Sequence, residues 1–247
     1  MNRATSFGSA AEDYEAARPG YPAEAADFVL SLAEVVTAIE VGAGTGKTTE
    51  AFARESLSIT CLEPDPAMAT ILRAKSLPGV TVVESTFEEW PGPREPVDLV
   101  FAGQVWHWLD RETAVARASD WLRQGGVIAL IWNVPSNRYD AFGHIYRQHA
   151  PQLLDEGDRR IGFRDSDVWL DDLERSGLQD VRLTVFTWHA DLDPTRLRAL
   201  YGSYSDHIAL DAPVRERLLD ALVESVEISG GTFRIEYETR VFTGLRG

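Results

Sequence analysis

The chain has 247 residues, of which 44% are hydrophobic and 26% are charged, a composition typical of one large globular domain. Its formal net charge of −15 at pH 7 disfavours nucleic acid as a partner, because affinity for a phosphate backbone comes mainly from Lys and Arg. No stretch reaches the roughly 20 apolar residues of a membrane span, so we expect a cytoplasmic protein without membrane partners.

The first half of the chain alternates between predicted strands and helices. A helical pattern begins at Pro22, and strand 38–41 then leads through a glycine turn into helix 47–55. Further strands are expected at 58–62, 80–84, 97–101 and 127–132, and helices at 66–75 and 111–123. Short apolar strands separated by helices are typical of βαβ units and of a parallel sheet covered on both faces. The fold class is therefore predicted to be α/β.

The second half is less regular. Residues 133–180 are polar and helical, and two interpretations stay open: a lid over the strand ends, or a crossover helix packed on the sheet. Strand 181–188 and two helical patterns from Pro194 and Pro213 follow. The alternation from Thr232 to Phe242, after a Gly-Gly turn, predicts a β-hairpin partner that completes the sheet.

The strongest motif is the turn Gly42-Ala43-Gly44-Thr45-Gly46, which lies between a strand and a helix. Such a turn brings backbone N–H groups against a ligand, with a helix N-terminus nearby. A P-loop would need Gly where Val41 stands, so that site is excluded. The dinucleotide fingerprint would need Gly where Lys47 stands, so a nicotinamide- or flavin-dependent oxidoreductase is only the alternative.

An acidic residue follows at the expected distance from this turn. Glu63 stands about 20 residues on, at the end of strand 58–62, where a carboxylate can accept hydrogen bonds from both hydroxyls of a ribose. The alternative is that Glu63 is only a solvated turn residue.

Three segments, Glu40–Gly46, Leu62–Asp65 and Ser85–Pro91, together resemble class I S-adenosylmethionine-dependent methyltransferases of the small-molecule type. The segment Tyr14–Pro22 also resembles a subgroup that includes trans-aconitate methyltransferase-like proteins, and the resemblance extends to about Trp132. It implies a Rossmann-like sheet of seven strands whose last strand is antiparallel. It also implies S-adenosylmethionine as cofactor and a small-molecule substrate.

One domain over 1–247 is expected. Its parts are an N-terminal helical segment (1–36), a cofactor-binding half (37–132), the possible lid (133–180) and the C-terminal part of the sheet (181–247).

The resemblance also implies positions for the cofactor. The methionine part of the cofactor would contact the glycine turn. The ribose would contact Glu63, and the adenine would contact Thr86 and Phe87. An Asp often stands where Thr86 is, so the usual acceptor for the adenine amino group is missing. Tyr14 and Arg18 match positions near the cofactor carboxylate, or alternatively form a structural N-terminal turn. The predicted cofactor-binding residues are Tyr14, Arg18, Glu40, Gly42, Ala43, Gly44, Gly46, Glu63, Pro64, Thr86, Phe87 and Gln104.

The methyl acceptor is expected beyond strand 97–101, because ligands of open α/β sheets bind past the carboxyl ends of the strands. Trp106, Trp108 and Tyr139 are predicted to contact it. His107 is the candidate catalytic residue, as a proton acceptor or as a group that orients a carboxylate. The alternative is that His107 only packs between two tryptophans.

Methyl transfer requires mainly alignment and exclusion of water. The five histidines show no metal-ligand spacing, so no metal is expected. The resemblance suggests an acceptor with a carboxylate or hydroxyl oxygen, which Arg138, Arg147 and Arg164 could bind. A noncatalytic protein that binds S-adenosylmethionine stays open as a third class.

Overall fold

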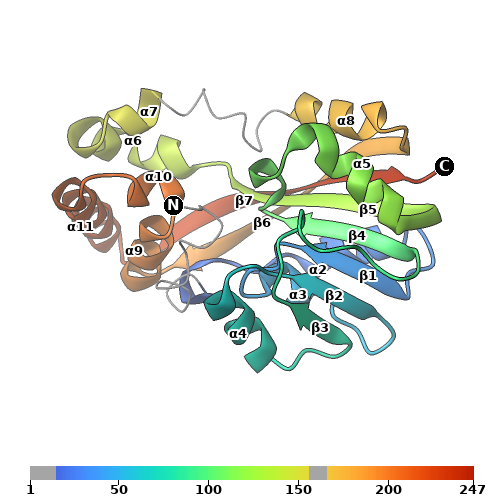
Figure 1. Cartoon of the computed structure of the whole chain (residues 1–247). Helices are drawn as coiled ribbons and strands as arrows, with labels where there is room; N and C mark the ends of the chain where they lie inside the picture. The colour runs from blue at the N-terminus through green and yellow to red at the C-terminus, as the bar shows by residue number, and fades with distance from the viewer. Residues whose placement is uncertain (1–14, 156–165) are drawn as a thin grey trace.

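The computed structural model describes residues 15–155 and 166–247. Helices cover both faces of one seven-stranded sheet of order β3-β2-β1-β4-β5-β7-β6 (Figure 1). The strands are β1 (Thr37–Val41), β2 (Ser58–Leu62), β3 (Val80–Val83), β4 (Val97–Gly103), β5 (Leu122–Pro135), β6 (Gln179–Leu192) and β7 (Phe233–Leu245). The helices are α2 (Ala23–Leu30), α3 (Lys47–Phe52), α4 (Pro66–Ala74), η3 (Trp106–Trp108), α5 (Arg111–Trp121), α6 (Arg138–His149), α7 (Gln152–Asp155), α8 (Ser166–Arg175), α9 (Pro194–Gly202), α10 (Ser205–Ile208) and α11 (Ala212–Ile228).

The pairing of the strands locates the binding edge of the sheet. β1 is parallel to β2 on one side and to β4 on the other, whereas β7 is antiparallel to both of its neighbours, β5 and β6. The α/β fold with an antiparallel last strand is thus confirmed. The strand order reverses between β1 and β4, and ligands of open α/β sheets bind beyond the carboxyl ends of the strands at such a reversal.

Two apolar layers hold the helices against the sheet. On one face, the ring of Phe52 in α3 stacks on Phe101 of β4 with centroids 4.3 Å apart. On the other face, Trp132 of β5 stacks on Trp169 of α8 at 4.9 Å. All four rings are almost fully buried, so aromatic side chains supply much of the contact that fixes both helical layers.

A third apolar cluster lies at one end of the sheet, where α6, α9, α10 and α11 gather around the ends of β6 and β7 (Figure 1). α11 packs against α6 and α9, and the buried side chains include Tyr146, Tyr201 and Leu222. α8, by contrast, packs on β6 and β7. The segment 133–180 therefore contains both a helix of this end cluster and a helix packed on the sheet.

Two expectations from the sequence differ from the structure. No local hairpin precedes Phe242, because α9, α10 and α11 separate β7 from its antiparallel partner β6. β5 also begins before the expected turn at Gly125 and Gly126. These glycines exchange backbone hydrogen bonds of 2.7 and 2.9 Å with Arg246, and this pairing carries the strand through the turn signal.

Within the described part of the chain, none of the helices has the length and apolar character that crossing a bilayer requires.

Candidate functional site

The glycine turn between β1 and α3 has the backbone conformation that its sequence predicts. Gly42, Gly44 and Gly46 have φ angles of 64°, 57° and 90°. A Cβ at Gly42 would lie 2.5 Å from Cγ2 of Val105, so packing alone requires glycine there. A Cβ at Gly44 would meet only Sδ of Met68, at 3.9 Å. Gly44 therefore borders open space that a side chain would fill, which fits a ligand-binding turn.

Glu63 is held directly beneath this turn. Its carboxylate is 4% exposed and accepts hydrogen bonds from the backbone N–H of Gly44 (2.7 Å) and of Asp65 (2.8 Å). Burial raises the pKa of Glu63, while the two backbone donors act in the opposite direction. Each carboxylate oxygen has a second lone pair, so a ribose hydroxyl can still bind. Glu63 is therefore not only a solvated turn residue: it supports the shape of the turn.

Glu40 occupies a different position from the other predicted ligands. It is buried in β1 and accepts hydrogen bonds from Oγ1 of Thr49 (2.6 Å) and from Sγ of Cys61 (3.6 Å). Burial raises the pKa of Glu40 to about 8. The side chain thus links β1, β2 and α3 underneath the turn.

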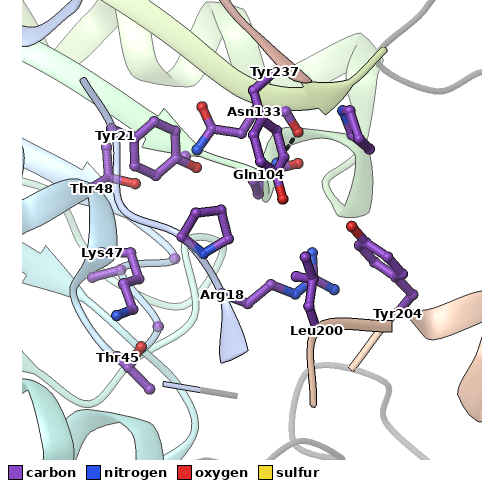
Figure 2. Close-up of a pocket in the computed structure, with 16 residues that line it drawn as sticks. Arg18, Tyr21, Thr45, Lys47, Thr48, Gln104, Asn133, Leu200, Tyr204 and Tyr237 are labelled. Atoms are coloured by element: carbon purple, nitrogen blue, oxygen red, sulfur yellow. Dashed lines mark hydrogen bonds between the residues drawn. The ribbon is translucent and has the colours of Figure 1, made fainter. Parts of the chain in front are cut away.

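A cavity opens from the glycine turn toward the end cluster of helices (Figure 2). Its walls come from the N-terminal segment, the turn, the carboxyl ends of β4 and β5, β7, and the region of α9 and α10. The lining residues are Arg18, Pro19, Tyr21, Gly42, Ala43, Gly44, Thr45, Lys47, Thr48, Gly103, Gln104, Asn133, Pro135, Leu200, Tyr204 and Tyr237. These residues include two cations and no Asp or Glu, although the whole chain carries a net charge of −15.

The N-terminal segment crosses the cavity and is fastened on its far side. Nε and Nη2 of Arg18 donate to Oγ (3.0 Å) and O (2.9 Å) of Ser203. The guanidinium also lies 4.7 Å from the ring centroid of Tyr204. Nδ2 of Asn133 donates to the carbonyl of Gly20 at 2.9 Å. Arg18 lines the cavity, but its guanidinium is directed to the end cluster, so its contact with the cofactor stays a prediction.

The same segment is fastened on its near side by an ion-pair network. Oε1 of Glu15 lies 2.8 Å from Nζ of Lys47 and 2.9 Å from Nζ of Lys75. Nζ of Lys75 also lies 3.1 Å from Glu50. Burial alone would raise the pKa of Glu15, but the hydrogen bonds from Lys47 and Lys75 hold it below its usual value. The network ties the N-terminal segment to α3 and α4.

Asn133 connects the cavity to the antiparallel edge of the sheet. Its Oδ1 accepts from Oγ1 of Thr239 (2.6 Å), which accepts from Nε1 of Trp188 (2.8 Å). Its backbone carbonyl accepts from Nε2 of Gln104 at 2.7 Å. The sequence interpretation missed Asn133, although a polar residue directly after the expected strand 127–132 is a signal that could have identified it.

The sequence around this site matches known proteins. Residues 39–130 match the family model of the methyltransferase domain. An uncharacterized methyltransferase of Mycobacterium tuberculosis is 40% identical over 133 residues, which are 54% of this chain and 54% of that protein. A trans-aconitate 2-methyltransferase of Rhizobium etli is 37% identical over 111 residues, 44% of this chain and 42% of that protein. The chain thus spans about half the length of these curated relatives.

The fold matches as well. A solved structure from Anaeromyxobacter dehalogenans, named for a type II methyltransferase, superposes with a TM-score of 0.65 at 19% identity and covers 92% of this chain and 97% of that one. Residues 39–130 thus resemble a methyltransferase domain, and the fold is similar to that of a solved methyltransferase structure. These matches support the predicted resemblance to class I methyltransferases, whose methyl donor is S-adenosylmethionine. Nothing in the comparisons supports the nicotinamide alternative.

The residues predicted to contact adenine are not lining residues of the cavity. Phe87 is buried, and its ring packs against Trp106 (5.8 Å between centroids) and Trp121 (4.9 Å). Oγ1 of Thr86 accepts from the backbone N–H of Glu89 at 3.1 Å. Pro64, Thr86 and Phe87 are not among the residues that line the cavity, so their contact with the cofactor stays a prediction.

The predicted substrate residues are likewise not lining residues of this cavity. Trp106 is 1% exposed and belongs to the core around Phe87, so its ring is not a wall of the cavity, whereas Trp108 is 49% exposed. Tyr139 lies in α6, but its side chain is outside what the structure describes, and Tyr14 lies outside the described residues altogether. Among the described residues, the aromatic side chains that line the cavity are instead Tyr21, Tyr204 and Tyr237.

His107 lies in η3, beyond the end of β4. Nε1 of Trp132 is 3.4 Å from its Nδ1, and its ring centroid is 4.8 Å from that of Trp108. Burial lowers the pKa of His107 to about 4. His107 does not line the cavity, and its catalytic role stays a prediction.

The arginines suggested for the acceptor are also placed elsewhere. Arg147 is exposed on α6, the side chain of Arg138 is not described, and Arg164 lies outside the described residues. Among the residues that are described, no group of three or more His, Cys, Asp and Glu side chains is arranged to hold a metal ion.

Proposed function

We propose that this protein transfers the methyl group of S-adenosylmethionine to an oxygen of a small-molecule acid or alcohol. The observation that supports this most directly is the cavity that begins at Gly44 and continues between Arg18 and Gln104 toward the end cluster. One end of this space has the backbone of a cofactor-binding turn. The other end has hydrogen-bonding side chains that an acceptor needs.

The residues present fit the cofactor. Gly44 leaves open space at the turn, and Glu63 accepts a hydrogen bond from its N–H while keeping lone pairs for ribose hydroxyls. When bound, the sulfonium supplies a methyl group that bonds to the acceptor oxygen as the sulfur–carbon bond breaks, with the electron pair staying on sulfur. The protein's own contribution is then to align the acceptor and to exclude water.

The lining of the cavity favours an acceptor with a carboxylate. Arg18 and Lys47 are its charged residues, of which Lys47 is paired with Glu15, and neither Asp nor Glu lies among the described residues of its walls. Arg18 is fixed by Ser203 and by the Tyr204 ring, so its charge is held at one place. A trans-aconitate 2-methyltransferase is among the relatives, which agrees with a small acid as substrate. A carboxylate is ionised near neutral pH, so its methylation needs no base.

Calorimetry and turnover test this proposal. S-adenosylhomocysteine is expected to bind the purified protein, whereas NAD is not. With labelled S-adenosylmethionine, methyl transfer is then measured into separate pools of small carboxylic acids, including trans-aconitate, and of small alcohols. Transfer into the acid pool supports a carboxylate acceptor, and transfer into the alcohol pool alone supports a hydroxyl. Binding of S-adenosylhomocysteine without turnover in either pool would contradict the acceptor class and favour the noncatalytic alternative.

A further inference from the structure

Gln104, the residue directly after β4, has an unusual backbone conformation. Among the described residues, three that are not glycine have a positive φ: Ser76 (50°), Gln104 (58°) and Asp180 (50°). Asn, Asp and His are enriched in this left-handed region, whereas Gln is not. Of the three, only Gln104 lines the cavity. Conformations of this kind cluster at functional sites when the surrounding structure holds them.

The surrounding structure does hold Gln104. Its backbone N–H donates to the carbonyl of Ile131 at 2.9 Å, and its Nε2 donates to the carbonyl of Asn133 at 2.7 Å, so both anchors come from β5. The preceding residue, Gly103, is packed so closely that a Cβ there would collide with Oγ1 of Thr48. The end of β4 therefore has no room to shift, and the conformation of Gln104 is imposed.

These anchors leave part of the side-chain amide available. A primary amide has two N–H groups and one carbonyl oxygen, and here one N–H is bonded to Asn133. Within the described chain, the second N–H and Oε1 of Gln104 make no hydrogen bond. Figure 2 shows the Gln104 side chain among the residues that line the cavity.

The choice of residue is informative. Gly or Asn would adopt a positive φ at lower cost and would satisfy the backbone at this position. Neither carries an amide at the reach of the glutamine side chain. The fold alone therefore does not explain a glutamine at position 104. A ligand that forms a hydrogen bond with its side-chain amide would explain it.

We propose that Gln104 is a positioning residue for the methyl acceptor, which it holds through the second N–H of its side-chain amide. This rests on the proposed function, and it assigns Gln104, which the sequence analysis placed among the cofactor-binding residues, to the acceptor instead. A carboxylate oxygen accepts such a hydrogen bond, and Arg18 lies across the same cavity to pair with its charge. With one oxygen held, the other is oriented for transfer, which is the kind of alignment that methyl transfer requires.

The test uses two substitutions and a matched control. Gln104→Gly removes the amide and relieves the backbone, and Gln104→Asn keeps a shorter amide that tolerates positive φ. Asp180→Gly is the control, because Asp180 has the same backbone conformation at the start of β6, at the opposite end of the strands from the cavity. Melting temperature, affinity for S-adenosylhomocysteine, and kcat and KM with the carboxylic acid pool are measured for each.

Both Gln104 variants are expected to melt at or above the wild-type temperature and to keep the wild-type affinity for S-adenosylhomocysteine. Their kcat/KM should fall by about tenfold or more, the scale of one hydrogen bond to a charged group. Asp180→Gly should keep the wild-type rate. An unchanged kcat/KM in Gln104→Gly overturns the proposal, and so does a loss of S-adenosylhomocysteine affinity that matches the loss of rate. The rate of the wild-type protein tests the proposed function. The ratio of kcat/KM between variant and wild type tests the role of Gln104.

Discussion

The indole N–H of Trp132 points at Nδ1 of His107 across 3.4 Å, and this contact determines how the imidazole can act. The indole is only a donor, so Nδ1 accepts and the proton of the neutral ring resides on Nε2. Since burial lowers the pKa of His107 to about 4, the ring is neutral at pH 7. To serve as a base at Nδ1, His107 would have to give up the bond from Trp132.

We therefore expect His107→Asn to retain most of the wild-type kcat on a carboxylate acceptor. The pH profile of kcat should show no inflection between about pH 5 and 8 that belongs to this residue. Steady-state rates measured across that range check both points. A drop in kcat on the order of 10², with affinity for S-adenosylhomocysteine intact, would instead establish His107 as a proton acceptor.

The same imidazole should make the fold sensitive to acid. Its pKa in the folded protein is about 4, below the ordinary 6.5, so the unfolded chain binds the proton first. The free energy of unfolding should therefore fall as the pH drops from 6.5 toward 4. His107→Asn should reduce this slope by up to about 1.4 kcal/mol per pH unit, measured by denaturant titration at pH 7, 6 and 5. If the pH dependence of the free energy of unfolding is the same in His107→Asn and the wild type, the protonated ring must gain a hydrogen-bond or ion-pair partner in the folded protein.

Gly44→Val should abolish binding of S-adenosylhomocysteine while the protein still folds, because the side chain would occupy the open space at the turn. The matched control is Gly177→Val. Gly177 also has a positive φ, 76°, and a Cβ there would meet nothing within 4 Å. Both variants should lose stability to backbone strain, but only Gly44→Val should lose affinity in calorimetry. Equal affinity in the two variants would refute the placement of the cofactor at this turn.

Glu63→Ala should weaken binding of S-adenosylhomocysteine by roughly 1.5–3 kcal/mol, the scale of a hydrogen bond to a charged group. Because Glu63 also accepts from the N–H of Gly44, its loss can act through ribose or through the turn. A 2′,3′-dideoxy analogue separates the two. If the substitution costs the analogue as much as the natural ligand, Glu63 acts by shaping the turn and not by binding ribose.

Glu15→Gln should loosen the N-terminal segment, since one carboxylate oxygen holds both Lys47 and Lys75. We expect S-adenosylhomocysteine to dissociate faster from this variant. The dissociation rate should also depend less on salt, because salt screens the ion pairs that the substitution removes. Stopped-flow fluorescence measures this rate. Glu84→Gln is the control, because it removes the exposed pair with Arg73 and should leave the rate unchanged.

The order of elements and the shape of the glycine turn could be predicted from the sequence because both depend on short stretches. The spacing of Gly42, Gly44 and Gly46 and the position of Glu63 are local patterns, and the structure places Glu63 directly against the turn. Strand lengths were less predictable. β5 extends beyond its apolar run because it pairs with β7, which lies about 100 residues later.

The acceptor side of the cavity could not be predicted in the same way. Arg18 contacts Ser203 across 185 residues of sequence, and no local pattern shows that α9 and α10 turn back over the glycine turn. The sequence favoured the aromatic residues around Trp106 as a binding site because they directly follow β4. The structure directs that ring into the core, while Tyr204 and Tyr237 reach the cavity from the last fifty residues of the chain.

Lys47 and Lys75 are the only two lysines among the 24 basic residues of the chain, and both sit on Glu15. Both lysine side chains of the chain therefore lie at the contact between the N-terminal segment and the glycine turn. Reagents that acylate amines must reach the nitrogen, and the side chains of Lys47 and Lys75 are only 21% and 14% exposed while they hold Glu15. Chemical labelling of lysines, read by mass spectrometry, thus becomes a selective probe of whether the N-terminal segment is seated on the glycine turn. Coupling the protein to a surface through its lysines would, for the same reason, disturb this contact.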